Sequence, residues 1–304
     1  MITKHIIERK NKNFIWFDIQ DIDIEDQKIL LEEHELTAKN LAYATDKYER
    51  ARYEHQDDLD LLIYNSPLKK IDVTNSFVLE PITFIVKKDT LFTFRSKALY
   101  LNIQEVLKRA IAEDEESSLM SFILTILYAI TIRYQKTIDS LNKTRDRYLS
   151  ELNHKISNQQ LLELSNVERS FVYIASGIKT NLLVLNSITD SEVITQKNSK
   201  DKKRLHSITV EAHQAEQTVS IALDVTERIS STANNLLNNN LNDVMRFLTI
   251  WSLVLTIPTI ITGFYGMNVT LPFANGPMAW INISIATIII IIILVIFFKI
   301  RKLF

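Results

Sequence analysis

The sequence predicts an α+β protein in three parts: an N-terminal α/β domain, a stalk of long helices and two C-terminal transmembrane helices. The strongest observation is a gap in the charges. Residues 247–298, 52 in a row, hold no Asp, Glu, Lys or Arg, although the chain has 35 Lys and Arg and 36 Asp and Glu. The gap is long enough for two membrane spans of roughly 20 residues each and a turn. The segment before this uncharged stretch has apolar residues at helical spacing, and the N-terminal segment before that has short strand-like runs.

Residues 1–102 are expected to form the α/β domain. Alternating or β-rich runs predict strands at 13–19, 52–55, 59–64, 77–86 and 91–94. The polar residues 87–89 predict the turn of a hairpin between the last two strands. Helices are expected at 23–36 and 37–44, with Thr37 as the N-cap of the second. Pro67 and Pro81 are expected at strand edges or connections, where a missing N–H costs little.

Residues 103–246 are expected to form the stalk, or funnel. Apolar residues recur every three or four positions from 123 to 152 and from 164 to 185, which predicts two long amphipathic helices. The polar stretch 189–200 predicts the turn before a third helix. From 201 to 264 the candidates for breaking a helix are Pro258 and Gly263, so we expect one continuous helix of some 60 residues, about 90 Å long.

Residues 247–304 are expected to form a transmembrane hairpin with a short basic tail. The spans are predicted at 247–264 and 279–298, joined by an outer loop, 265–278. Arg246 precedes the hairpin, the loop has no cation, and the cations after it are Lys299, Arg301 and Lys302. The positive-inside rule therefore predicts a multi-pass protein of the cell (inner) membrane with both termini cytoplasmic.

Composition excludes several classes of protein. The four Gly form no spaced cluster for phosphate or dinucleotide binding, and the absence of Cys excludes thiolate metal sites, Cys nucleophiles and disulfides. Residues 1–246 carry 32 Lys and Arg against 36 Asp and Glu, a net charge of −4 that speaks against nucleic-acid binding. Residues 1–10 have no apolar run of signal-peptide length. We therefore expect a cytosolic polar part, no enzyme, and no catalytic or cofactor-binding residues.

The first span carries small and polar side chains at steps of three and four, which places them on one face of a helix. This polar stripe comprises Asn242, Met245, Thr249, Ser252, Thr256, Thr259, Gly263 and Gly266. Met245 and Leu248 are candidates for a hydrophobic constriction. Small residues let membrane helices pack closely, but the stripe could also line a water-filled pore. One hairpin cannot enclose a pore, so the pore interpretation requires a homo-oligomer.

The segment Tyr265-Gly266-Met267-Asn268 directly follows the uncharged first span and precedes a short loop, a last apolar helix and a basic tail. This arrangement resembles the CorA family of magnesium and cobalt transporters, the two-span Gly-Met-Asn metal ion transporters, over about residues 242–302. The resemblance implies a homopentamer with five first spans around a central pore. It also implies ion recognition at the outer mouth by Gly266, Met267 and Asn268, an inner mouth at Asn242, and gating by cytosolic Mg²⁺.

The chemistry of these residues suits a hydrated ion. Mg²⁺ dehydrates reluctantly and prefers oxygen ligands. A ring of Asn268 carboxamide and Gly266 carbonyl oxygens would hydrogen-bond the water shell of the ion and bind weakly enough to release it. Many family members have an acidic residue in the outer loop, whereas residues 269–278 have none. We expect Mg²⁺ as the transported ion and regulatory ligand, and no resident cofactor.

The sequence leaves alternatives open for the transported ion and for the class of protein. Zinc, cobalt or nickel could be the ion, although zinc prefers His and Cys, and the six His lie far from the hairpin. His206 and His213 are expected to be solvated or core residues. The acidic clusters near residues 57–60 and 113–116 are expected to be solvated faces, so the regulatory carboxylates stay unassigned. A membrane-anchored structural or signalling protein with a coiled-coil stalk would need neither the polar stripe nor the Gly-Met-Asn turn.

Overall fold

The computed structural model describes residues 1–8, 13–56, 59–70, 76–99, 118–152, 158–190, 199–269, 272 and 278–301. The chain divides into two compact units, Met1–Ser230 and Ser231–Phe304. Helix α7 (Ser199–Tyr265) contributes residues to both units. The domain boundary expected near residue 102 lies outside the described residues.

The first unit contains a mixed sheet. Its described strands are β1 (Ile2–Ile7), β2 (Phe14–Gln20), β3 (Arg52–Gln56), β4 (Leu59–Lys69), β5 (Phe77–Lys87) and β6 (Thr90–Arg95), in the spatial order β1-β2-β6-β5-β4-β3. Strands β2 and β6 pair in parallel, and the other neighbours are antiparallel. The five predicted strands and the hairpin between β5 and β6 are confirmed, whereas β1 was not predicted.

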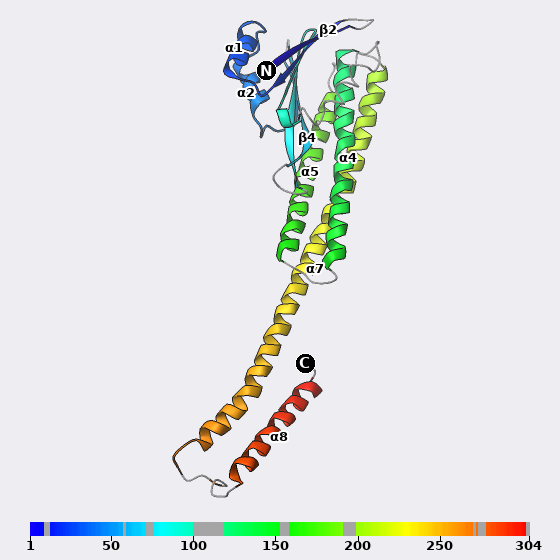
Figure 1. Cartoon of the computed structure of the whole chain (residues 1–304). Coiled ribbons are helices and arrows are strands. Elements are labelled where there is room, and N and C mark those ends of the chain that lie inside the picture. Colours follow the sequence, from blue (N-terminus) through cyan, green and yellow to red (C-terminus); the bar gives the residue numbers. More distant parts are fainter. Residues whose placement is uncertain are drawn as a thin grey trace. The chain divides into compact units, whose positions relative to one another are not determined.

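One face of the sheet is covered by α1 (Ile24–Glu32) and α2 (Ala38–Thr45), as Figure 1 shows. Thr37 is the N-cap of α2, as predicted, because its hydroxyl oxygen accepts a hydrogen bond of 3.1 Å from the backbone N–H of Asn40. An apolar cluster fills the space beneath these helices and includes Ile19, Leu30, Leu41 and Phe92.

The other face is covered by α4 (Leu119–Leu152) and α5 (Asn158–Asp190), and the first part of α7 packs into the same core (Figure 1). The predicted apolar stripes of these helices are buried there, including Ile130, Phe171 and Ile208. Gly177 permits a close approach of α5 to the sheet and to α4. A Cβ atom at Gly177 would lie 2.6 Å from both Leu79 Cδ2 and Tyr134 Oη.

Strands β4 and β5 extend beyond their outer neighbours as a two-stranded ribbon. Strand β3 pairs with β4 up to Ile63, and β6 pairs with β5 from Thr83 onward. Pro67 and Pro81 lie inside this ribbon, opposite Leu79 and Asn65. Of the two places expected for them, strand edges or connections, the structure shows the first, because both lie within strands that have an open edge. They are tolerated within strands because each ribbon strand has only one paired neighbour, so one edge needs no N–H from proline.

Side chains from α4 and α5 complete the backbone hydrogen bonds of Asn65 in this ribbon. The N–H of Asn65 donates to Oδ1 of Asn181 at 2.9 Å. Its carbonyl accepts from Nδ2 of Asn181 and from the hydroxyl of Tyr134, both at 2.9 Å. Asn181 and Tyr134 are buried, and burial raises the pKa of the Tyr134 hydroxyl well above its usual value. These bonds attach the sheet to α4 and α5.

The second unit is a helical hairpin built from the last part of α7 and from α8 (Ala279–Ile300). The most apolar window of each helix is only 6% buried, so both are candidate membrane spans, as predicted. Helix α5 is also long and apolar enough, but half of its window is buried. Because α5 packs against β4 and β5, we interpret it as a core helix.

Candidate ion pathway

Helix α7 carries the polar stripe without a break. It is continuous from Ser199 to Tyr265, so the spacing of three and four residues keeps the stripe on one face. The predicted pore-lining residues all lie in α7 and are exposed, namely Asn242, Met245, Leu248, Thr249, Ser252, Thr256, Thr259 and Gly263. From Asn242 to Gly266 the stripe extends for about 36 Å at 1.5 Å per residue, which exceeds the roughly 30 Å hydrocarbon core of a bilayer.

The threonines of the stripe offer acceptor oxygens. The hydroxyl of Thr249 donates to the carbonyl of Met245 at 2.8 Å, that of Thr256 to Ser252 at 2.7 Å, and that of Thr259 to Leu255 at 2.8 Å. A hydroxyl has one hydrogen and two acceptor lone pairs. With that hydrogen engaged, each oxygen can only accept hydrogen bonds from a partner along the stripe. Such a surface favours cations and their bound waters over anions.

The middle of the stripe is hollowed. A shallow concavity of about 250 Å³ is lined by Ser252, Leu255, Thr256, Thr259 and Ile260. Pro258 lies inside the helix at this level. Because proline has no N–H, the carbonyl of Val254 cannot receive the usual helical bond from residue 258.

One acceptor near the stripe was not predicted. The hydroxyl of Thr262 donates to the carbonyl of Pro258 at 2.8 Å, so its oxygen is also left as an acceptor. Thr262 does not fit the single series of steps by which the stripe was defined. The sequence signal that could have revealed it is its spacing, because Thr262 lies three residues after Thr259 and four before Gly266.

The Gly-Met-Asn turn follows directly where α7 ends. The N–H of Gly266 donates to the carbonyl of Thr262 at 2.9 Å, and the N–H of Met267 to Phe264 at 3.3 Å. A Cβ atom at Gly266 would lie 3.1 Å from the carbonyl oxygen of Thr262, which is tight. The side chains of Met267 and Asn268 are exposed at this end of the stripe. The structure thus brings Gly266, Met267 and Asn268 together, while their role in ion recognition stays a prediction.

The opposite end of the stripe begins with an asparagine-rich stretch of α7. Asn242 is exposed there, and so are Met245 and Leu248 one turn further along. Asp243 and Arg246 form an exposed pair with Oδ1 and Nη1 3.7 Å apart. Exposed pairs of this kind contribute little to stability. Along α7, Met245 and Leu248 thus lie between the asparagine-rich stretch and the threonines of the stripe.

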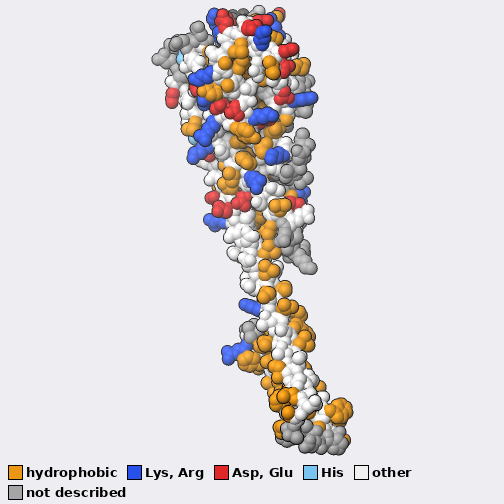
Figure 2. Space-filling view, turned by 90° about the vertical axis from the view of Figure 1, so that its left-hand side faces the viewer, with side chains coloured by type: hydrophobic (Ala, Val, Ile, Leu, Met, Phe, Trp, Pro, Cys, Tyr) orange, Lys and Arg blue, Asp and Glu red, His pale blue; other side chains and the backbone are white. Residues whose placement is uncertain are grey.

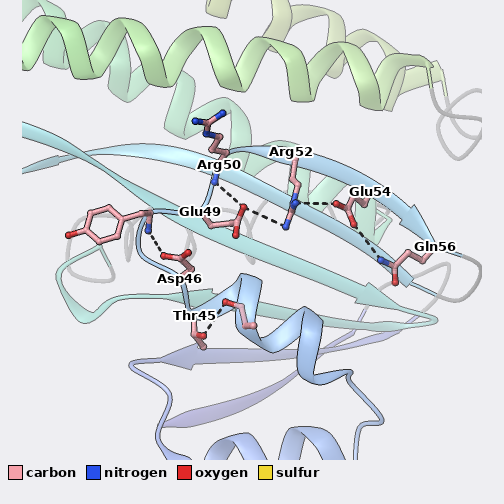
Figure 3. A network of polar contacts seen from close by, with 9 residues as sticks. Thr45, Asp46, Glu49, Arg50, Arg52, Glu54 and Gln56 are labelled. Atoms are coloured by element: carbon pink, nitrogen blue, oxygen red, sulfur yellow. Dashed lines mark hydrogen bonds and ion pairs between the residues drawn. The ribbon is translucent and has the colours of Figure 1, made fainter.

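Several acidic side chains of the α/β domain are paired with arginine or histidine. Figure 3 shows Arg52 between Glu49 and Glu54, with nitrogen–oxygen distances of 3.5 and 3.3 Å. Oδ1 of Asp60 lies 2.7 Å from Nδ1 of His55. Asp57, Asp58 and the cluster at 113–116 lie outside the described residues. Within the described ranges, no group of three or more His, Asp or Glu side chains could hold a metal ion.

The histidines that the structure describes all belong to the first unit. His206 and His213 belong to the first unit and are exposed, and Nδ1 of His213 lies 3.4 Å from Oε2 of Glu216. They fit the expectation of solvated side chains. His154 lies outside the described residues.

Comparison with known proteins agrees with this architecture. Residues 11–301 match the family described as CorA-like Mg²⁺ transporter protein. The chain is 25% identical, over 305 residues, to the cobalt/magnesium transport protein CorA of Methanocaldococcus jannaschii, covering 96% of this chain and 92% of that protein. It is 21% identical, over 278 residues, to the magnesium transport protein CorA of Helicobacter pylori, covering 87% of this chain and 86% of the relative.

A solved structure is similar over nearly the whole fold. The complete structure of the CorA magnesium transporter from M. jannaschii superimposes with a TM-score of 0.80 at 21% sequence identity, covering 98% of this chain and 96% of that one. The family match extends from the α/β domain through the stripe and into the basic tail. The chain therefore belongs to the family of CorA-like Mg²⁺ transporter proteins.

Proposed function

We propose that five copies of this chain form a central pore that takes up hydrated Mg²⁺ across the cell (inner) membrane. Family membership supports the coarser statement, transport of a divalent cation. The observation that carries the finer proposal is the row of acceptor oxygens along α7 in a segment without charged side chains. In this proposal Gly266, Met267 and Asn268 recognise the ion at the outer mouth.

The acceptor row suits a hydrated divalent ion. Mg²⁺ holds its waters tightly, and those waters present hydrogens outward. Threonine hydroxyls whose own hydrogens are bonded to the helix can accept from these waters. Neutral oxygens add no charge that would trap the ion, and release is as necessary for conduction as binding.

A pore requires more than one copy. The hairpin contributes one first-span helix, and from residue 247 onward its described side chains are mostly exposed, with Ile250 and Thr287 as the buried ones. Lipid and neighbouring copies would cover the rest. The pentamer is supported by the family resemblance, and its test is native mass spectrometry of the detergent-solubilised protein. A pentamer is expected, whereas monomers or dimers at all concentrations would refute the pore.

Met245 and Leu248 would form the constriction. Both are large, apolar and exposed on α7 at the end of the stripe near Asn242. A ring of such side chains can close a pore by excluding water. Cytosolic Mg²⁺ would favour the closed state if it bound that state more tightly. Millimolar Mg²⁺ should then protect the stalk from protease relative to EDTA, and identical digestion in both would refute a Mg²⁺ sensor.

The identity of the ion is a second question. Relatives are named for magnesium and for cobalt, and the stripe offers hydroxyl, amide and thioether groups but no imidazole or thiolate. Zinc would prefer imidazole or thiolate ligands. The alternatives to Mg²⁺ are cobalt, nickel and, less well matched to these groups, zinc in the same fold. Flux of each ion into proteoliposomes would decide between them.

The direct test of transport is rescue of a bacterium deficient in magnesium uptake. Growth at low Mg²⁺ is expected from cells that express this chain, and not from cells with an empty vector. If the chain inserts in the membrane as a stable oligomer but neither rescues growth nor passes Mg²⁺ in proteoliposomes, the membrane-anchor alternative is favoured.

The proposed orientation places both termini in the cytoplasm. Because the chain has no Cys, single cysteines give an unambiguous test. Val269→Cys in the outer loop should react with a membrane-impermeant thiol reagent in intact cells. Lys299→Cys should react only after permeabilisation, and the reverse pattern would overturn the orientation.

A further inference from the structure

The charged side chains that the structure describes in the hairpin lie at one end of it. Arg246 immediately precedes the uncharged stretch 247–298, and Lys299 and Arg301 immediately follow it. Lys302 lies outside the described residues. On the face shown in Figure 2 the hairpin presents mostly hydrophobic and uncharged side chains, and its few Lys and Arg lie at one end.

The two helices bring these cations to a common level. From 247 to 265 α7 rises about 27 Å, and from 279 to 298 α8 rises about 29 Å, at 1.5 Å per residue. The two helices are antiparallel within this unit, so both extend from the loop toward the same side, as Figure 1 shows. Equal lengths of chain therefore separate the loop from Arg246 and from Lys299. Both lengths are close to the roughly 30 Å thickness of a hydrocarbon core.

The cations are available to a partner. Arg246 has an exposed side chain (63%), and its carboxylate neighbour, Oδ1 of Asp243 at 3.7 Å, is equally open to solvent (72%). Such a pair is weak and easily exchanged. Lys299 and Arg301 are exposed, and within the described part of the chain neither has an ion pair with a carboxylate.

Aromatic rings adjoin the cations on the side of the uncharged stretch. The ring centroids of Phe247 and Trp251 lie 6.0 Å apart in an edge-to-face arrangement, directly after Arg246. The guanidinium of Arg301 lies 5.8 Å from the ring centroid of Phe297. Aromatic side chains next to Arg and Lys are typical of the boundary between hydrocarbon and headgroups.

We propose that Arg246, Lys299 and Arg301 bind phosphate groups of anionic phospholipids, such as phosphatidylglycerol, at this boundary. Free phosphate is disfavoured, because the rings of Phe247 and Phe297 beside the cations suit acyl chains. The inference rests on the membrane placement of the spans in the proposed function, but not on ion flux. Asp243 competes for Arg246 and repels the lipid, so it sets how tightly the lipid is held.

The test uses the full-length protein in lipid nanodiscs with phosphatidylcholine and increasing phosphatidylglycerol, and native mass spectrometry to count the retained lipid. Preferential retention of phosphatidylglycerol is expected. Arg246→Gln and Lys299→Gln should each weaken retention about fivefold, as for one cation near an anionic surface. Lys202→Gln, a change of the same kind at an exposed position far along α7, is the matched control and should have no effect.

Asp243→Asn separates lipid binding from a merely structural ion pair. Removal of the competing carboxylate should strengthen phosphatidylglycerol retention. If the ion pair were merely structural, Asp243→Asn and Arg246→Gln would both break it and would change lipid retention equally. Equal retention of both lipids by the wild type would overturn the proposal, as would displacement by inorganic phosphate at comparable concentrations. Since Mg²⁺ flux is measured separately, a failure of lipid binding is distinguishable from a failure of transport.

Discussion

At the scale of residues, the side chain of Asn181 makes the backbone hydrogen bonds that a neighbouring strand would otherwise make with Asn65 in β4. It bonds both the N–H and the carbonyl of Asn65, whose strand neighbour is Pro81. Asn181→Ala would leave the buried N–H of Asn65 without a partner, which costs about 1–3 kcal/mol. We expect the full-length protein in detergent to unfold at a lower temperature by several degrees.

Ser187→Ala is the matched control for Asn181→Ala. Ser187 is an exposed residue of α5 whose hydroxyl bonds to the carbonyl of Leu183 in its own helix. Its removal should change the free energy of unfolding by no more than about 0.5 kcal/mol. Equal unfolding temperatures for Asn181→Ala and Ser187→Ala would contradict the role assigned to Asn181.

Protonation of His34 is expected to lower the stability of the folded protein. His34 lies against the rings of Phe17 and Phe92, with centroid distances of 4.6 and 5.3 Å. Burial lowers the pKa of His34 below its usual 6.5, with Lys4 and Lys87 adding to the effect and Glu33 opposing it. The unfolded chain therefore binds a proton more readily than the folded one. The stability contributed by neutral His34 is present above pH 6.5 and is lost as the pH falls below that value.

The expected result is a pH-dependent gap between the wild type and His34→Gln. The wild type should lose thermal stability relative to the variant between about pH 7 and pH 5, because Gln does not titrate in this range. His206→Gln, at an exposed position, controls for the loss of a histidine. A difference that is independent of pH would show that His34 acts through packing alone.

At the scale of elements, the stripe of α7 makes the sharpest prediction. Thr256→Val keeps the shape of the side chain but removes an acceptor oxygen that lines the concavity. The loss of a hydrogen bond to a charged partner is worth about 1.5–3 kcal/mol, so Mg²⁺ flux into proteoliposomes should fall by about tenfold. Thr218→Val, at an exposed position earlier on α7 with the same bond to its own helix, should leave flux unchanged. Equal flux in both variants would exclude the stripe as the ion path.

Elements with strong local signals could be predicted from the sequence. Helix α7 was expected because Pro258 and Gly263 are the main breaking candidates from 201 to 264, and the helix runs through both. Strand β1 was not expected, since its sequence ITKHII has no turn signal before it and is defined by pairing with β2. The ribbon of β4 and β5 was missed because partners on α5, more than 100 residues away, stabilise it.

At the scale of the whole molecule, the match to the CorA-like transporter family covers both the α/β domain and the hairpin. The residues of the stripe and the Gly-Met-Asn turn could be placed from sequence, because helical spacing and a contiguous motif are local properties. The regulatory carboxylates could not be placed. Sites shared between copies depend on contacts that neither spacing nor a single chain determines.

The central claim is that a ring of neutral oxygens at the outer mouth selects a hydrated divalent ion. It is tested most directly by Mg²⁺ flux through Asn268→Ala pentamers in proteoliposomes, with Val269→Ala as the neighbouring control. Asn268 is exposed beyond the end of α7, so the variant should fold and assemble normally. Loss of an acceptor in every copy should reduce flux by at least about tenfold. Wild-type flux through a folded Asn268→Ala pentamer would contradict the claim.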